Sequence, residues 1–133
     1  MKEFHLQIVT PDGVKFDGEA LSVLAKCEGG DVEIMAGHAD LFATLGIGKA
    51  RIKTKDSARV GSCAGGFISV FDGEVKIVAT TFEYADEIDR ERAERARTAA
   101  EAAIKEASDT LAIEKAKLKL SRALNRIKVS ELK

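Results

Sequence analysis

The stretch Phe82-Glu83-Tyr84-Ala85-Asp86-Glu87-Ile88-Asp89-Arg90 separates two parts of the chain that differ sharply in composition. All eleven glycines, the single proline and every aromatic residue lie at or before Tyr84, whereas eleven alanines lie between Ala85 and Lys133. Glycine and proline favour turns, while alanine is the strongest helix former. The composition therefore predicts a β-rich domain over residues 1–85 and a helical domain over residues 86–133.

The first part carries short runs of alternating apolar and polar residues or of β-branched residues, which are typical of strands. We expect strands at 4–8, 21–25, 32–35, 50–53 and 75–79, with turns at 11–13, 29–31, 46–48 and 72–73. Many short strands between turns are typical of an antiparallel β-sandwich. Because a domain of this size buries only about 60–65% of its unfolded surface, we also expect a face that docks onto a partner.

The second part is rich in charge and lacks helix breakers until Ser108-Asp109-Thr110, which predicts an antiparallel hairpin of two helices. We expect Asp86 to cap the first helix and Ser108 or Asp109 to cap the second. Each helix has an apolar stripe at three- or four-residue spacing: Ala93, Ala96, Ala100, Ala103 and Ala107, then Ile113, Ala116, Leu120, Ala123, Leu124 and Ile127. An alanine seam buries few methylene groups, so this hairpin should separate easily. The fold class is α+β.

Charge is unevenly distributed along the chain. The formal net charge of -1 gives no reason to expect a nucleic acid or an anionic membrane surface as partner. From Leu111 onward, seven basic residues stand against two acidic ones, which leaves about +5 on the last helix. Two interpretations stay open: a solvated helix face, or a basic helix that binds an acidic protein surface.

Signatures of an enzyme are missing from the sequence. There is no phosphate-binding loop, nucleophile elbow or metal-spaced cluster of histidine and cysteine, so we expect neither catalysis nor a metal site. Cys27 and Cys63 are expected to be buried, reduced thiols. No apolar run approaches the roughly 20 residues of a spanning helix, and the N-terminus does not resemble a signal peptide. We therefore expect a cytosolic or peripheral protein.

Several segments together resemble the epsilon subunit of bacterial F-type ATP synthases, over the full length of the chain. They are Val9-Thr10-Pro11-Asp12-Gly13, Gly30-Asp31-Val32-Glu33-Ile34-Met35-Ala36-Gly37-His38-Ala39-Asp40-Leu41, and Gly65-Gly66-Phe67-Ile68-Ser69-Val70 before Val75-Lys76-Ile77-Val78-Ala79. The helical pair follows at the distance expected in the family. The resemblance implies a non-catalytic rotor subunit of the central stalk.

That resemblance also implies partners and a location. The partners would be the gamma subunit, the c-ring and the alpha and beta subunits of the catalytic head, at the cytoplasmic face of the bacterial membrane. The helices would restrain ATP hydrolysis. By analogy, Glu28, Gly29, Gly30 and Asp31 face the ring, the His38 region faces gamma, and the basic face of Lys115, Lys119, Arg122 and Arg126 meets an acidic segment of beta.

Residues 88–93, Ile88-Asp89-Arg90-Glu91-Arg92-Ala93, are similar to a motif that binds regulatory ATP in some relatives. By this resemblance, Glu83, Ile88, Asp89 and Ala93 surround the adenine, while Arg92, Arg122 and Arg126 hold the triphosphate. ATP would be a regulatory ligand and not an obligatory cofactor. An ordinary helix-surface pair of Asp89 and Arg92 is an equal alternative. A stand-alone ATP-sensing module is the second functional hypothesis.

Overall fold

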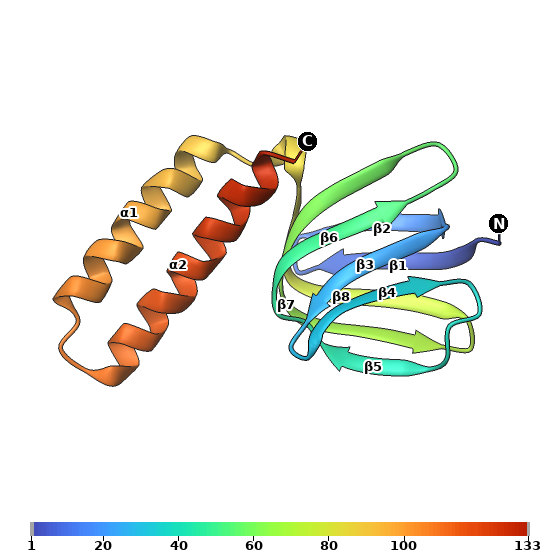
Figure 1. Ribbon diagram of the computed structural model, residues 1–133, viewed down its shortest axis with the longest axis horizontal. Coiled ribbons are helices and arrows are strands. Elements are labelled where there is room, and N and C mark those ends of the chain that lie inside the picture. Colours follow the sequence, from blue (N-terminus) through green and yellow to red (C-terminus); the bar gives the residue numbers. More distant parts are fainter. Residues whose placement is uncertain (1, 133) are drawn as a thin grey trace. The chain divides into compact units, whose positions relative to one another are not determined.

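The computed structural model describes residues 2–132 and consists of two compact units, with the chain passing from the first to the second between Tyr84 and Ala85 (Figure 1). The first unit contains eight strands: β1 (Phe4–Thr10), β2 (Gly13–Ala20), β3 (Ser22–Cys27), β4 (Gly30–Met35), β5 (Leu41–Thr44), β6 (Ile47–Lys53), β7 (Ala58–Phe71) and β8 (Glu74–Tyr84). The second contains a short 3-10 turn, η1 (Ala85–Glu87), and the helices α1 (Arg90–Glu106) and α2 (Thr110–Ser130).

The strands form one continuous hydrogen-bonded sheet in the order β2-β1-β8-β7-β6-β3-β4, with β5 also paired to β7. The sheet folds over on itself into two layers, which confirms the predicted sandwich (Figure 1). One seam departs from the antiparallel pairing, because β1 and β8 run parallel through the pairs Leu6–Val75 to Val9–Val78. Turn signals could not reveal this seam, because its two strands lie at opposite ends of the domain.

Strand β7 turns the corner between the layers at Gly65 and Gly66. Residues 58–64 pair with β6, whereas residues 67–70 pair with β5. Both glycines have positive φ, 72° and 98°. A Cβ on Gly66 would overlap the carbonyl oxygen of Val78 and lie 2.9 Å from Ala79 Cα. Only glycine combines this backbone conformation with such a close approach of the neighbouring strand.

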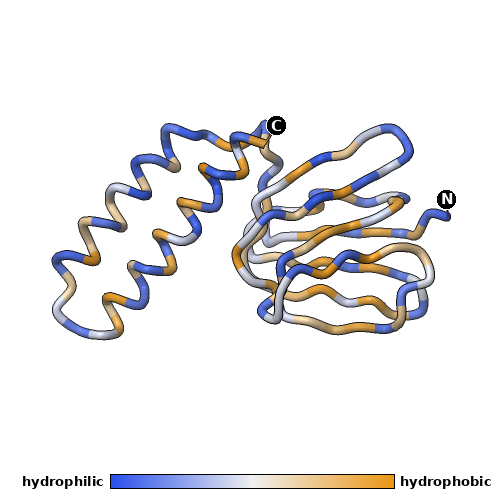
Figure 2. Tube along the Cα trace, in the orientation of Figure 1, coloured by the Kyte–Doolittle hydropathy of each residue, from blue (hydrophilic) through white to orange (hydrophobic). Residues whose placement is uncertain are grey.

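The core of the sandwich consists mainly of aliphatic side chains that point inward from both layers, together with the aromatic rings of Phe4, Phe82 and Tyr84. Phe4, Leu6 and Ile8 of β1 are buried and alternate with more exposed neighbours, as their spacing predicts. Figure 2 shows hydrophobic and hydrophilic residues interspersed along the strands. The two cysteines are buried free thiols, as expected. Burial raises the pKa of the Cys63 thiol to about 12, so this thiol stays protonated at neutral pH.

Local sequence signals located some turns and missed some strands. The Asp72-Gly73 turn joins β7 to β8, and Asp72 has φ 50°, as a tight hairpin turn of this kind requires. The turn predicted at 46–48 is too long, because Ile47 and Gly48 already belong to β6 and pair with Ala64 and Cys63. Three strands were missed. β2 lies at the edge with few buried side chains, β5 has only four residues, and β7 is interrupted by three glycines, which weaken a strand pattern.

Candidate functional site

Aspartate side chains begin both helices of the second unit. Asp89 has an extended backbone, and its carboxylate accepts a hydrogen bond of 3.1 Å from the backbone N–H of Arg92. The prediction that Asp86 caps the first helix is therefore wrong, because Asp86 lies in the 3-10 turn that precedes it. Asp109, one of the two residues predicted to cap α2, does so: its carboxylate accepts a hydrogen bond of 2.7 Å from the backbone N–H of Ala112. Such a cap stabilises a helix by about 1 kcal/mol.

Four buried alanines form the seam between the helices. Ala93 and Ala100 of α1 and Ala116 and Ala123 of α2 recur at seven-residue spacing and are at most 4% exposed. Ala96 and Ala103, predicted in the stripe, are exposed instead, and so is Leu124. Each buried alanine provides about 2 kcal/mol less than a buried leucine would, at about 0.8 kcal/mol per methylene. The contact between the helices is correspondingly shallow.

The loop of residues 107–109 reverses the chain, so the start of α1 lies beside the end of α2 (Figure 1). An ion pair of 2.9 Å between Arg90 Nη2 and Glu131 Oε1 joins these two ends. Both side chains are more than half exposed, so the pair contributes little to stability. Sequence reasoning missed this pair, because its partners lie 41 positions apart.

This end of the hairpin brings together six of the seven predicted nucleotide-site residues: Ile88, Asp89, Arg92 and Ala93 at the start of α1, and Arg122 and Arg126 in the last turns of α2. The seventh, Glu83, belongs to β8 in the first unit. Arg92 and Arg122 are exposed, and within residues 2–132 neither makes an ion pair. Two guanidinium groups at this end are thus available to a phosphate.

The apolar members of the predicted adenine site are buried in this conformation. Ala93 is fully buried in the seam and Ile88 is 8% exposed. Asp89 uses one carboxylate oxygen for the helix cap, so only the other is available to an adenine amine. The predicted arginines are therefore accessible, while the predicted adenine contacts are mostly covered.

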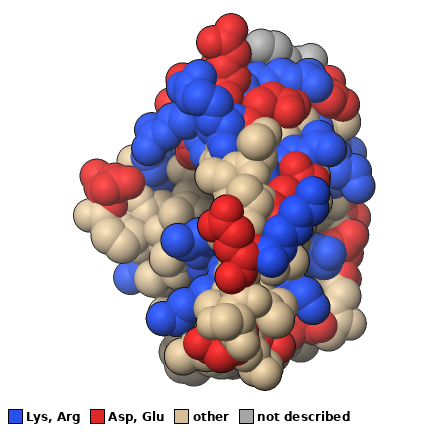
Figure 3. Space-filling model, turned by 90° about the vertical axis from the view of Figure 1, so that its left-hand side faces the viewer, with Lys and Arg blue, Asp and Glu red and all other residues tan. Residues whose placement is uncertain are grey.

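The exposed faces of the two helices differ in how their charges are balanced. Along α1, Arg90, Glu94, Arg97 and Glu101 form a ladder with separations of 3.7–3.9 Å. Figure 3, which faces the hairpin, shows basic and acidic side chains interspersed over this surface. On α2, Lys115, Lys119 and Arg122 make no ion pair within the part of the chain that is described. With Arg126, their spacing places them along one face of α2, which we call the basic stripe.

The loop residues predicted to meet partners lie exposed on the sandwich. Glu28, Gly29, Gly30 and Asp31 lie in and beside the turn between β3 and β4. His38 lies in the loop before β5 and donates from Nδ1 to the carbonyl oxygen of Ala39 at 2.7 Å. The end of the same loop is held in place, because the Asp40 carboxylate accepts a hydrogen bond of 3.1 Å from the backbone N–H of Asp72 in the neighbouring hairpin turn.

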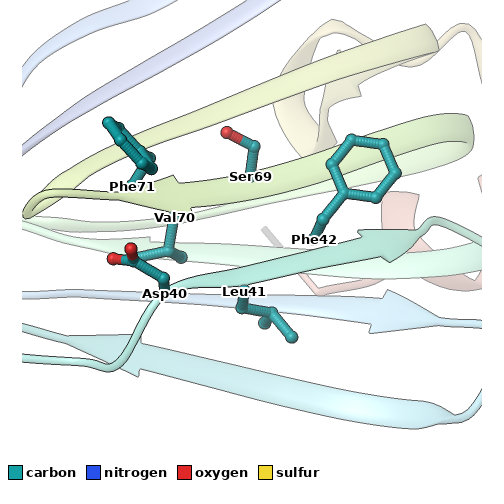
Figure 4. Close-up of a pocket in the computed structure, with 6 residues that line it drawn as sticks. All are labelled: Asp40, Leu41, Phe42, Ser69, Val70 and Phe71. Carbon is teal, nitrogen blue, oxygen red and sulfur yellow. The ribbon is translucent and has the colours of Figure 1, made fainter.

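An exposed aromatic patch lies next to that loop, where sequence reasoning identified no site. Phe42 and Phe71 are 69% and 70% exposed, and Phe42 stacks on Phe67 with ring centroids 5.0 Å apart. Between them is a hollow of about 380 Å³, lined by Asp40, Leu41, Phe42, Ser69, Val70 and Phe71 (Figure 4). The residue types gave a signal, because Phe42 and Phe71 fall on the solvent side of strands whose alternate residues face the core.

Comparisons with known proteins place the whole chain in one family. Residues 3–85 match the model described as "ATP synthase, Delta/Epsilon chain, beta-sandwich domain", and residues 86–131 match the model of its long alpha-helix domain. The chain therefore belongs to the delta/epsilon chain family of the ATP synthases.

Similar full-length relatives are the ATP synthase epsilon chains of Bacillus velezensis and Bacillus cytotoxicus. The first is 38% identical over 98% of both chains, and the second is 37% identical over 100% of both. Within the family, the chain thus groups with bacterial epsilon chains, which are accessory and not catalytic parts of the enzyme.

Solved structures share the fold at low identity. A chain of the Euglena gracilis mitochondrial ATP synthase superposes with a TM-score of 0.82 at 19% identity, covering 98% of this chain and 82% of that one. A chain of the Tetrahymena thermophila mitochondrial ATP synthase gives 0.70 at 17% identity and 97% coverage of both. None of the helices within residues 2–132 is long and apolar enough to cross a bilayer.

Proposed function

We propose that the chain is a rotor subunit in the central stalk of a bacterial F-type ATP synthase. There it couples the flow of protons or sodium ions through the c-ring to ATP synthesis, peripherally at the cytoplasmic face of the membrane. The full-length match to epsilon chains supports this proposal and favours it over a stand-alone ATP sensor. The similar chains of known structure come from assemblies described as "OSCP/F1/c-ring" and "central stalk/cring".

The observation that carries the proposal is the aromatic patch around Phe42 and Phe71. Two phenylalanines that are about 70% exposed beside a shallow hollow form an apolar surface that water solvates poorly. The patch adjoins the loop that carries His38, the residue expected to face gamma. We assign this patch to the gamma subunit. The sandwich must bind gamma tightly if the two subunits are to rotate together.

The test is binding of gamma by a Phe42→Ser/Phe71→Ser variant. Removing two aromatic anchors from an interface should weaken binding at least tenfold, since each contributes about 1 kcal/mol or more. Val14→Ser is the matched control, because Val14 is also an exposed apolar strand residue at 60% exposure, but lies on β2. Equal binding by the double variant and the control would exclude the patch as the gamma site.

The hairpin supports a role in restraining ATP hydrolysis. Its seam is shallow, and α2 has 21 residues, which at 1.5 Å per residue reach about 32 Å. A weakly held helix of this length could leave its partner and present the basic stripe to an acidic surface of the beta subunit.

Charge reversal tests this role in the assembled enzyme. Lys115→Glu/Lys119→Glu should relieve the restraint and raise the ATP hydrolysis rate, because two attractions become repulsions. Lys117→Glu/Lys128→Glu is the control, since these exposed lysines lie on the opposite flank of the same helix. If the two pairs change the rate equally, net charge and not the basic stripe is responsible.

Regulation by ATP is a separate part of the proposal. The exposed Arg92 and Arg122 support it, and ATP bound there would favour the closed hairpin. Calorimetry and melting at millimolar ATP test it, with Arg92→Ala as the variant and the exposed Arg95→Ala as control. We expect heat and a raised melting temperature in the wild type and the control only. Absence of binding heat in the wild type would remove ATP from the proposal.

A further inference from the structure

Three ionisable side chains meet on adjacent strands of the sandwich, beside the aromatic patch, because Glu74 is the cross-strand partner of Phe71. His5 lies on β1, Asp17 on β2 and Glu74 at the start of β8. The imidazole Nε2 is 2.7 Å from Asp17 Oδ1, and Nδ1 is 2.7 Å from Glu74 Oε2. The Asp17 carboxylate also accepts a long contact of 3.5 Å from the Gln7 amide.

This geometry specifies the protonation state of the imidazole. A carboxylate can only accept a hydrogen bond, and a neutral imidazole has a single N–H to donate. Both short contacts can form together only when both nitrogens carry protons. The hydrogen bond to Asp17 and then that to Glu74 accordingly raise the pKa of His5 above its ordinary value.

The surroundings of His5 favour the cation. Glu19 is its direct cross-strand neighbour on β2, and Lys76 on β8 pairs with Gln7 on the same face. Glu3, two residues before His5, is engaged by Lys55 at 3.3 Å. Acidic groups thus outnumber basic ones on this face of the three strands.

The location of the cluster gives it a role in the fold. Within residues 2–132, the only strand pairing between the β1–β2 hairpin and the rest of the sheet is the parallel β1–β8 seam, which has four residue pairs. The first pair of this seam is Leu6–Val75. His5 immediately precedes Leu6 on β1, and Glu74 immediately precedes Val75 on β8. A side-chain bridge at this point ties both strands of the hairpin to β8.

We infer that His5, Asp17 and Glu74 form a proton-dependent clasp that holds the N-terminal β1–β2 hairpin to β8. The sign of its pH dependence follows from the raised pKa. The stabilisation is complete below the unfolded value of about 6.5, and it is lost as pH rises through the higher folded value. Alkaline conditions should therefore loosen this edge of the sandwich.

The test is an NMR titration of the His5 imidazole in the full chain. A His38→Gln background leaves His5 as the only histidine, since the sequence has two. We expect a pKa above 6.5, lowered by Glu74→Gln and by Asp17→Asn. Glu19→Gln, which removes the same charge without a hydrogen bond to the ring, should lower it less. A His5 pKa at or below 6.5, or equal effects of all three variants, would overturn the clasp.

Thermal melting gives a second readout that does not depend on resonance assignment. The melting temperature of the wild type should exceed that of His5→Gln at pH 5.5, and the difference should vanish at pH 9.5. A difference that stays the same at both pH values would show that His5 contributes only packing. Should His5→Gln fail to fold, Glu74→Gln takes its place in this comparison.

Discussion

The change Gly66→Ala should be among the most damaging single substitutions in the sandwich. Gly66 has φ 98°, and an added Cβ would overlap the Val78 carbonyl oxygen. The obstruction is backbone, so no side-chain rotation relieves it. The β7–β8 ladder must instead move apart at the corner where β7 changes partners.

Substitutions at two other glycines distinguish the free-energy cost of backbone strain from that of steric clash. Gly37 has φ 85° with nothing within 4 Å of an added Cβ, whereas Gly29 has neither a positive φ nor a close neighbour. Gly37→Ala should cost about 1–2 kcal/mol from backbone strain alone. Gly29→Ala should stay within about 0.5 kcal/mol, and Gly66→Ala should exceed about 4 kcal/mol because clash adds to strain.

Unfolding of the sandwich can be followed specifically by tyrosine fluorescence. Tyr84 is the single tyrosine and the chain has no tryptophan. It is 5% exposed, and its hydroxyl donates to the carbonyl oxygen of Lys15 at 2.8 Å. At about 4 °C per kcal/mol or more, Gly66→Ala should lower the melting temperature by about 15 °C or more. If Gly66→Ala and Gly37→Ala have the same melting temperature, the close approach of Val78 has no energetic consequence, which contradicts the steric explanation.

Three further outcomes follow from single contacts. Asp40→Ala removes the acceptor of Asp72 N–H and should lower the unfolding free energy by about 0.5–1.5 kcal/mol, measured by urea titration; no change would mean that water replaces the carboxylate. Asp109→Ala should lower helicity at 222 nm by removing a cap worth about 1 kcal/mol, whereas Asp109→Asn should retain it, and equal loss in both would exclude capping. A thiol reagent at pH 8 should leave Cys63 unmodified in the native chain and label Cys27 and Cys63 in denaturant; rapid native labelling of Cys63 would contradict its burial.

The sequence predicted the fold wherever the local pattern alone determines the structure. The alternation of Phe4, Leu6 and Ile8 predicted a half-buried strand, and Asp72-Gly73 predicted a hairpin turn; both are confirmed. The parallel β1–β8 seam could not be predicted, because it depends on how distant strands meet. The cap at Asp89 was misplaced to Asp86 because two aspartates three residues apart are equally good caps by composition, and only backbone conformation distinguishes them.

For the candidate sites too, local spacing predicted which residues share a helix face but not what depends on packing between helices. Helical spacing grouped Arg122 with Arg126 correctly, since four residues make about one turn. Spacing could not show that Ala93 is buried in the seam or that Arg90 meets Glu131, because both depend on how the helices pack. The alternation along β5 and β7 is a signal for the exposure of Phe42 and Phe71, but it can be used only once both segments are known to be strands.

Rotation of the sandwich with the shaft is the most direct test of the proposed role. A single reactive cysteine in place of the exposed Asp12 can carry a fluorophore, because Cys27 and Cys63 are buried. In single assembled ATP synthase molecules hydrolysing ATP, the label should turn with gamma relative to the fixed alpha and beta subunits. A label that stays stationary with the alpha and beta subunits while gamma turns would contradict a rotor subunit.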